Sequence, residues 1–368
     1  MTNDSNRPAE RRERLQQVLE RAGLSAMLVT SEINVRYLTG FTGDSTYLLL
    51  DQGRPLLISD RRYETQLAEE CPGVDSFIRP PDLTLPLAAA QALAKAGGKK
   101  FGFDPHSTSF ALYTLFKEQA AQATLVPVEG LVEGLRAVKD ADEIAEIRRA
   151  VDLAIEGINA LKPRLTSGRT ERECAWELEA TMRCSGAAGF AFAPIIAVGD
   201  RAAMPHYHAG DRLIGESPLI LVDWGAETHS CYRSDLTRTF FTGRPGSEME
   251  RVYEVVLEAQ RQAIAAIRPG VAGKAVDAIA RKVIAEAGYG ELGHGLGHGF
   301  GLEIHEQPRL APNFPHVLEA NMVVTVEPAI YIRGQFGVRI EDDVLVTPDG
   351  CEVLSRALPS DWESAQIA

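Results

Sequence analysis

The sequence predicts a two-domain protein in which a smaller α/β domain precedes an α+β domain made of two similar halves. The chain has 368 residues, more than one hydrophobic core usually serves. Helical and strand-like patterns alternate along the first 134 residues, whereas residues 135–368 repeat the order helix, helix, strands. We therefore expect two domains, 1–134 and 135–368.

The first domain shows clear helical and strand-like stretches. A helical pattern covers residues 8–22 and ends at Gly23, and a second one covers 85–96 and ends at Gly97. Strand-like runs cover 26–30, 46–50, 55–59 and 100–103. Together these elements predict an α/β domain.

The second domain repeats one architecture. Four helices are expected over 140–162, 171–186, 248–267 and 274–287, each pair followed by strands. Capping boxes at Thr170–Glu173 and Ser247–Glu250 mark two of the helix starts, and Pro163 ends the first helix. Two α-α-β halves related by a pseudo-twofold would join their sheets under an outer layer of helices, with a site between the halves.

Composition excludes several classes of protein. The net charge is −13 and no extended basic run occurs, so we expect no nucleic-acid partner. No window approaches 18 apolar residues, and residues 1–6 are polar, so we expect neither a membrane span nor a secretory signal. Five scattered cysteines predict reduced, mostly buried thiols and a cytoplasmic protein.

Two aspartates mark the first candidate site. Asp223 ends an apolar run, and a glycine turn leads to a second strand pattern that contains Asp235, which predicts an antiparallel pair. A carboxylate near the core needs a partner. On these residues alone a second interpretation stays open, in which Asp223 caps a turn and Asp235 pairs with Arg233 or Arg238.

Glycine occupies every second position from residue 293 to 301. If this segment is extended, His294 and His298 share one face, and the bare glycine face allows close approach of another backbone or a ligand. His305 follows seven residues after His298. Taken singly, these histidines fit hydrogen-bonded core residues equally well.

Two glutamates complete the set. Glu327 ends a β-branched run, and Glu341 stands in an acidic strand pattern. Strand alternation puts Arg339, Glu341 and Asp343 on one face and Asp342 on the other, so Arg339 and Glu341 form a candidate inward pair. A solvated acidic edge is the alternative interpretation.

The four acids are more informative together, because acids are usually excluded from apolar strands. Two like charges about 4 Å apart repel by about 4 kcal/mol at an effective dielectric of ~20, and two divalent cations would balance four carboxylates. Carboxylates with one imidazole suit Mn²⁺, with Co²⁺, Zn²⁺ or Fe²⁺ as alternatives. The sequence therefore predicts a two-metal hydrolytic site made of Asp223, Asp235, His298, Glu327 and Glu341.

The order Asp, Asp, His, Glu, Glu resembles that of the pita-bread metallopeptidases, the family of creatinase, aminopeptidase P and prolidase. The matching segments are VDWGAE, YRSDLTRTF, HGLGHGFGLEIHEQPR, VEPAIY and VRIEDDVLVT, and the helical repeat extends the match to about residue 140. NVRYLTGF and DRRY in the first domain are similar to the creatinase-type domain of the proline-specific members. The resemblance implies a pita-bread domain after a creatinase-type domain.

The resemblance also implies residue roles. Asp223 would bridge or chelate one metal, Asp235 and Glu341 would bridge both, and His298 and Glu327 would hold the first metal. His206 would be the histidine on the substrate side, His305 would stabilise the tetrahedral intermediate, and Arg309 would bind the substrate's C-terminal carboxylate. Arg339 would support Glu341, and Tyr331 would form part of the pocket wall.

The implied reaction is hydrolysis of the peptide bond before proline. A metal-activated water attacks the carbonyl carbon, His305 stabilises the oxyanion, and Glu327 carries a proton to the imide nitrogen. A non-catalytic interaction module of this fold would usually lack ligands, and a metal-free amidinohydrolase would not need the full acid set.

The resemblance leaves Xaa-Pro dipeptidase and Xaa-Pro aminopeptidase both open. Arg309 favours the dipeptidase, whose substrate is a proline-containing dipeptide rather than an oligopeptide. Because relatives of this family are often dimers, the resemblance implies a homodimer.

Overall fold

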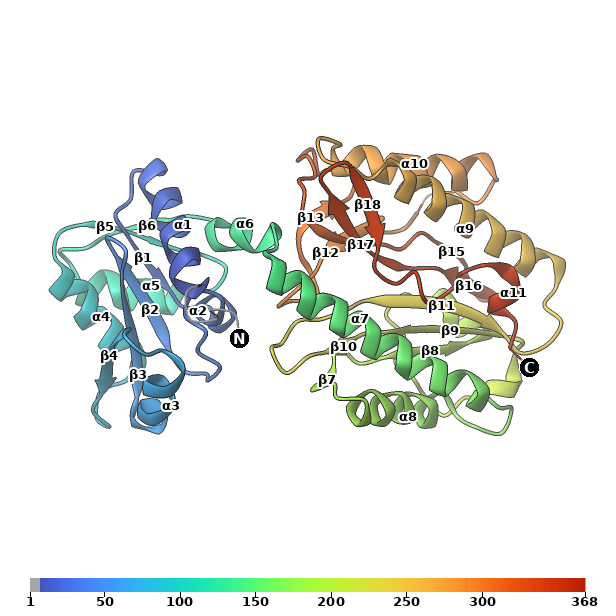
Figure 1. The fold of residues 1–368 in the computed structure, drawn as a ribbon, viewed down its shortest axis with the longest axis horizontal. Coiled ribbons are helices and arrows are strands. Elements are labelled where there is room, and N and C mark those ends of the chain that lie inside the picture. The colour runs from blue at the N-terminus through green and yellow to red at the C-terminus, as the bar shows by residue number, and fades with distance from the viewer. Residues whose placement is uncertain (1–6, 291, 368) are drawn as a thin grey trace. The chain divides into compact units, whose positions relative to one another are not determined.

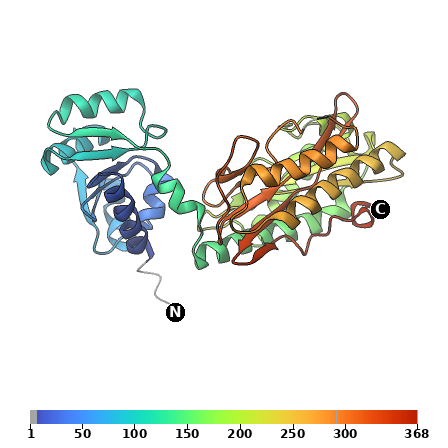
Figure 2. The same ribbon diagram turned by 90° about the horizontal axis from the view of Figure 1, so that it is seen from above.

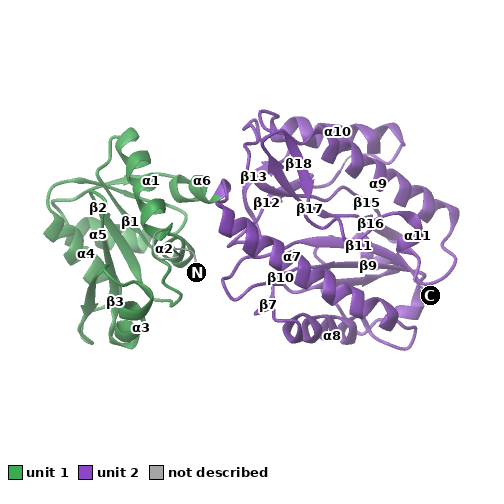
Figure 3. Ribbon diagram, in the orientation of Figure 1, with its two compact units in different colours: residues 1–136 green, residues 137–368 purple. Residues whose placement is uncertain are grey.

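The computed structural model describes residues 7–290 and 292–367 and divides into two compact units, 1–136 and 137–368 (Figure 3). The polar segment 1–6, which carries the prediction of no secretory signal, lies outside the described residues. Within the described part, no helix combines the length and the apolar character that a membrane span requires.

Unit 1 is built on one mixed six-stranded sheet in the order β4-β3-β2-β1-β5-β6 (Figure 1). Its strands are β1 (Ala26–Val29), β2 (Tyr47–Asp51), β3 (Arg54–Asp60), β4 (Asp75–Arg79), β5 (Lys100–Phe103) and β6 (Thr124–Pro127). Its helices are α1 (Arg7–Arg21), α2 (Glu32–Thr39), η1 (Arg61–Tyr63), α3 (Glu64–Glu70), α4 (Leu85–Ala96), α5 (Phe110–Gln119) and α6 (Leu131–Ala137), which runs into unit 2.

Unit 2 contains two halves, each with a pair of packed helices before its strands (Figure 1). The helices are α7 (Ala141–Leu161), η2 (Lys162–Arg164), α8 (Glu171–Cys184), η3 (Gly199–Ala203), η4 (Ile214–Glu216), α9 (Ser247–Ala266), α10 (Gly273–Glu286) and α11 (Trp362–Ala365). Figure 2 shows α9 and α10 side by side, as the repeat predicts.

The strands of unit 2 form two main sheets, β8-β9-β11 from the first half and β13-β12-β14-β17-β18 from the second. The first half has β7 (Gly189–Phe190), β8 (Ile195–Val198), β9 (Leu219–Trp224), β10 (Ala226–Glu227) and β11 (Leu236–Phe241). The second half has β12 (Gly297–Gly299), β13 (Glu306–Leu310), β14 (Val323–Val326), β15 (Ala329–Ile332), β16 (Phe336–Arg339), β17 (Asp342–Thr347) and β18 (Gly350–Val353). A β-bridge between Thr237 and Glu341 joins the two halves.

Helix caps explain most of the helix starts. Thr170 and Glu173 form the predicted capping box of α8. The capping box predicted at Ser247 is wrong, because α9 begins at Ser247 itself and Gly246 takes the cap position without a side-chain hydrogen bond. A capping box that the sequence analysis missed, Asp140–Glu143, opens α7.

All five cysteines lie within the described residues, and all are free thiols. Cys71 and Cys174 are buried, whereas Cys184 is exposed and the other two are half-buried. The prediction of mostly buried thiols is therefore wrong for three of the five.

Candidate metal centre and substrate cavity

The five predicted ligands converge where the two halves of unit 2 meet. Asp223 lies near the end of β9, and Asp235 directly precedes β11. His298 is the middle residue of β12, Glu327 directly follows β14, and Glu341 directly precedes β17. The first half thus supplies two aspartates, and the second half supplies the histidine and two glutamates.

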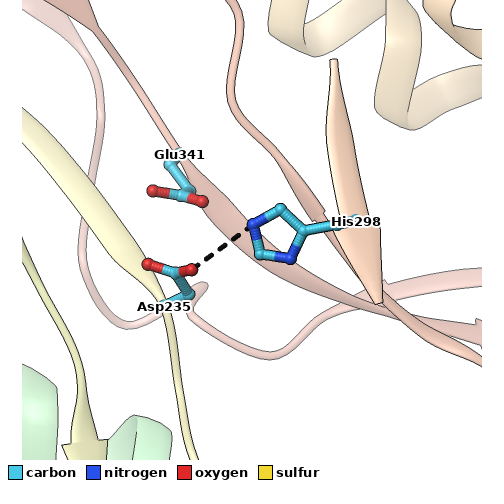
Figure 4. A group of neighbouring side chains, drawn as sticks. All are labelled: Asp235, His298 and Glu341. Carbon is cyan, nitrogen blue, oxygen red and sulfur yellow. Dashed lines mark ion pairs between the residues drawn. The ribbon is translucent and has the colours of Figure 1, made fainter. Parts of the chain in front are cut away.

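Asp235, His298 and Glu341 form the densest part of this cluster (Figure 4). One ligand atom from each residue lies within 4.8 Å of the other two. His298 Nε2 is 3.6 Å from Asp235 Oδ2 and 3.4 Å from Glu327 Oε1. Asp223 Oδ1 is buried without a hydrogen-bond donor among the described residues. A buried carboxylate oxygen needs a partner, so this oxygen-rich set with one imidazole fits divalent metal ions.

Burial raises the pKa of the carboxyl groups in the cluster. It raises the pKa of Glu327 to about 8, and it raises the pKa of Asp223. For Asp235 and Glu341, burial and then neighbouring carboxylates raise the pKa well above its ordinary range. Burial also lowers the pKa of His298 to about 3, so its imidazole is neutral at physiological pH, the form that binds a metal.

Hydrogen bonds to neighbouring threonines hold two of the ligands in place. Thr237 Oγ1 donates to Glu341 Oε2 at 2.7 Å, and the Glu341 amide donates to Thr237 O at 3.0 Å. The His298 amide donates to Thr325 Oγ1 at 3.1 Å. The first bond pair links the two halves directly.

Arg339 has a different partner from the one that the sequence predicts. Its Nη2 donates to Asp223 Oδ2 at 2.5 Å, Nε donates to Thr237 Oγ1 at 3.1 Å, and Nη1 donates to Tyr331 OH at 2.7 Å. Arg339 and Glu341 both line the cavity, as the predicted inward pair requires, but their hydrogen bonds connect them only through Thr237. The arginine side chain reaches across to β9, while Glu341 is hydrogen-bonded by Thr237.

The alternative interpretations of the acids are excluded by their contacts. Arg233 pairs with Glu227 at 2.8 Å, and Arg238 pairs with Asp342 at 2.6 Å, so neither arginine is the partner proposed for Asp235. The acidic strand is not a solvated edge, because Glu341 is 2% exposed and its neighbours are buried as well.

His298 is flanked by Gly297 and Gly299, where backbone segments of neighbouring strands come very close. A Cβ atom on Gly297 would lie 2.0 Å from Thr325 O, and one on Gly299 would lie 2.2 Å from Gln307 O. The predicted close approach is therefore confirmed, and the group that approaches the glycines is the backbone of neighbouring strands. The extended segment is shorter than predicted, since β12 spans only three residues and His294 lies outside it.

A cavity of about 820 Å³ opens above the cluster. Its floor is acidic, whereas the exposed His206, His305 and Arg309 line its wall. The rings of His298 and His305 meet edge to face with centroids 4.4 Å apart. The cavity brings together all ten predicted site residues: Asp223, Asp235, His298, Glu327, Glu341, His206, His305, Arg309, Tyr331 and Arg339.

The geometry agrees with the comparison to known families. Residues 145–348 match the model of metallopeptidase family M24, and residues 11–138 match that of the creatinase/prolidase N-terminal domain. The chain belongs to metallopeptidase family M24. It is therefore a metallopeptidase, and divalent metal ions are implied by its family.

Similar proteins cover almost the whole M24 chain. An Xaa-Pro dipeptidase from Pyrococcus furiosus is 35% identical over 350 residues, 94% of this chain and 98% of the relative. The structure of an Xaa-Pro dipeptidase from Bacillus anthracis has a TM-score of 0.90 at 38% identity, covering 95% and 98% of the two chains. An X-Pro aminopeptidase from Thermotoga maritima has a TM-score of 0.84 at 35% identity, covering 93% and 98%. The predicted fold, a creatinase-type domain before a pita-bread domain, is confirmed.

Sequence reasoning assigned no role to two histidines that line the cavity of this M24 chain, His208 and His294. His294 Nε2 lies 3.4 Å from Tyr331 OH. The glycine alternation places His294 on the same face as His298, so that signal could have found it. Thr237 gave no signal, because a threonine in a strand is ordinary.

Proposed function

We propose that this metallopeptidase is an Xaa-Pro dipeptidase, a prolidase, that hydrolyses the peptide bond before proline with two divalent metal ions. One observation carries the proposal: four carboxylates and His298 converge on the floor of a cavity whose wall carries His206, His305 and Arg309. The likeness to the Xaa-Pro dipeptidases of P. furiosus and B. anthracis, over most of each chain, supports the substrate.

The five clustered residues would hold the two ions, and we propose Mn²⁺ as the metal. Two divalent ions would balance the four carboxylates Asp223, Asp235, Glu327 and Glu341, and the neutral imidazole of His298 completes the set. When bound, such ions supply a nucleophilic water at neutral pH and polarise the substrate carbonyl.

The protein's own groups would carry the remaining steps. Burial lowers the pKa of His305, so its neutral ring can donate an N–H hydrogen bond to the oxyanion that develops on the carbonyl. The Glu327 carboxylate would accept a proton and deliver it to the proline nitrogen, which must be protonated to leave. His206 would hold the substrate against the cavity wall, together with Tyr331.

Arg309 bears on the choice between dipeptide and longer substrates. In an Xaa-Pro dipeptide the proline carries a free carboxylate, and a guanidinium in the cavity wall can bind it through two hydrogen bonds. A longer peptide has a neutral amide at this place. Xaa-Pro aminopeptidase remains the second candidate because of the likeness to the T. maritima enzyme.

The proposal is tested by assaying Ala-Pro and Ala-Pro-Ala with Mn²⁺ and with EDTA. A dipeptidase cleaves only Ala-Pro, and only with metal, and Arg309→Gln raises the KM for that substrate. An aminopeptidase releases alanine from Ala-Pro-Ala. Cleavage of neither peptide in the presence of Mn²⁺ contradicts both candidates.

We also propose that residues 1–134 and 135–368 act as the creatinase-type and catalytic domains of a cytoplasmic homodimer. The five free thiols support a reducing compartment. Light scattering of the purified protein tests the dimer, since a mass near 40.0 kDa instead of twice that value would contradict it.

A further inference from the structure

Glu327 and Glu341 face each other across a gap between two antiparallel ladders. The β14–β17 ladder ends at the pair Val326 and Asp342, and the β15–β16 ladder begins in the same register at Ala329. Two residues on each of the two paired segments lie between the ladders, Glu327 and Pro328 on one and Ile340 and Glu341 on the other. Both glutamates therefore stand at an interruption of regular strand pairing.

The interruption has a chemical cause. In the continued register, Pro328 stands opposite Ile340. The Ile340 amide donates to Pro328 O at 3.5 Å, but proline has no N–H with which to return a hydrogen bond to Ile340 O. A carbonyl next to Glu341 thus needs a donor from elsewhere.

Gln260 supplies this donor from helix α9. It is 1% exposed, and its Nε2 donates to Val326 O and to Ile340 O, each at 3.2 Å. These carbonyls belong to the residues directly before the two glutamates. Only the NH₂ end of an amide can serve two carbonyl acceptors, so the orientation of the side chain is fixed by its contacts.

The first half of unit 2 has a matching arrangement on helix α7. Trp224 Nε1 and Ser234 Oγ donate to backbone carbonyls of α7 at 2.9 and 3.2 Å. Trp224 directly follows Asp223, and Ser234 directly precedes Asp235. In both halves, the first helix, α7 or α9, is hydrogen-bonded to the residues next to the two carboxylates of that half.

We propose that Gln260 is a positioning residue that holds the backbones of Glu327 and Glu341 at the separation that metal binding requires. The inference rests on the proposed role of these glutamates as ligands. The ladders stop on either side of this pair of glutamates, so few backbone hydrogen bonds hold the two strands at a fixed separation there. The Gln260 amide limits the separation of the two strands because it donates to a backbone carbonyl of each one.

The test compares metal binding among matched variants. Gln260→Met keeps the side-chain length but removes both donors, and Gln260→Asn keeps the amide but is too short to reach both carbonyls. Gln262→Met is the same change on the exposed face of α9, where Gln262 Nε2 donates to Glu258 Oε1 at 2.7 Å, one turn away on the same helix. Val256→Ala opens a hole in the buried face of the same helix and leaves the amide intact.

Mn²⁺ affinity is measured by titration calorimetry well below each variant's unfolding temperature, together with the visible spectrum of the Co²⁺ form. We expect Gln260→Met to bind Mn²⁺ about 10- to 100-fold more weakly with an altered Co²⁺ spectrum. Gln262→Met and Val256→Ala should match the wild type in both readouts. If Gln260→Met does not fold, Gln260→Asn decides, with weaker binding again expected.

Wild-type affinity and spectrum in the Gln260 variants would overturn the inference, and so would equal weakening by Val256→Ala, which would reveal a general stability effect. If the wild-type protein itself binds no Mn²⁺ or Co²⁺, the proposed function fails instead, so the two failures are distinguishable.

Discussion

In the first half of unit 2, Asp223 lies inside a continuous antiparallel ladder, whereas in the second half Glu327 and Glu341 lie where ladders are interrupted. The β9–β11 pairing runs unbroken over six residue pairs, with Asp223 opposite Thr237. The second half instead places its ligands at a proline gap and between glycines. Regular strands can therefore present one carboxylate, but bringing two glutamates and a histidine to the same point needs irregular backbone.

Side-chain hydrogen bonds from both halves compensate for that irregularity. Gln260, Thr237 and Thr325 each donate to or accept from the backbone or side chain of a residue in the cluster or next to it. In the first half, strand pairing supplies most of this order. We therefore expect the second half to be more sensitive to substitution than the first.

The largest effect is expected from Glu341→Gln, which removes one second-half carboxylate. Loss of a metal ligand should lower kcat/KM for Ala-Pro by about 10³-fold or more, since metal ions contribute several kcal/mol to such reactions. At pH 8 with EDTA, the variant should unfold at a higher temperature than the wild type, because burial raises the pKa of Glu341 and disfavours its ionised form.

Glu319→Gln, an exposed acid of the same half, is the matched control and should leave activity and unfolding unchanged. Wild-type metal content and activity in Glu341→Gln would contradict the ligand role.

Gly297→Ala should give the next largest effect, because the new methyl group would meet Thr325 O at 2.0 Å. We expect the free energy of unfolding to fall by about 3 kcal/mol, with weaker Mn²⁺ binding, as β12 moves away from β14. Gly293→Ala, where a Cβ meets nothing within 4 Å, is the control for denaturant unfolding. Equal stability of the two variants would show that the close approach is not needed.

The smallest effect is a pH dependence of the metal-free protein. The pKa of Glu327 is about 8 in the folded state against an ordinary 4.5, so the folded state holds a proton that the unfolded state has lost. Stability should therefore fall as pH rises from 6.5 to 8, by about 3 °C in Tm. Below pH 6.5 His298 has the opposite effect. Because its folded pKa is about 3, the unfolded state takes up a proton first, and stability falls as the pH falls.

The measurement is calorimetry in EDTA at several pH values, with Glu327→Gln as the variant that should flatten the slope. A Tm that rises between pH 6.5 and 8 would show that the Glu327 carboxyl is already ionised without metal.

Long periodic elements of the fold were predictable from the sequence. The helix expected over 140–162 is α7 (Ala141–Leu161), because its apolar residues recur at helical spacing over many turns. Helix α2 was missed although Ser31 caps it and Gly40 ends it, since eight residues carry too little periodicity. Local patterns predict an element only when it is long enough to repeat them.

The chemistry of the cluster was predictable because acids in apolar strands are unusual, but their partners were not. Arg339 contacts Asp223, 116 residues away, and Gln260 contacts Ile340, 80 residues away. Strand alternation assigns residues to faces of one strand and says nothing about which other strand or helix lies against that face. For this reason strand alternation predicted that Arg339 and Glu341 share a face but could not predict that Arg339 binds Asp223.

The salt bridge between Asp223 and Arg339 also has a consequence for synthesis. A ribosome makes the first half's aspartates long before it makes the arginine, the histidine and the glutamates. A nascent chain that ends before Arg339 contains Asp223 without its salt-bridge partner and also lacks Glu341. The full set of predicted ligands therefore exists only after most of unit 2 has been translated.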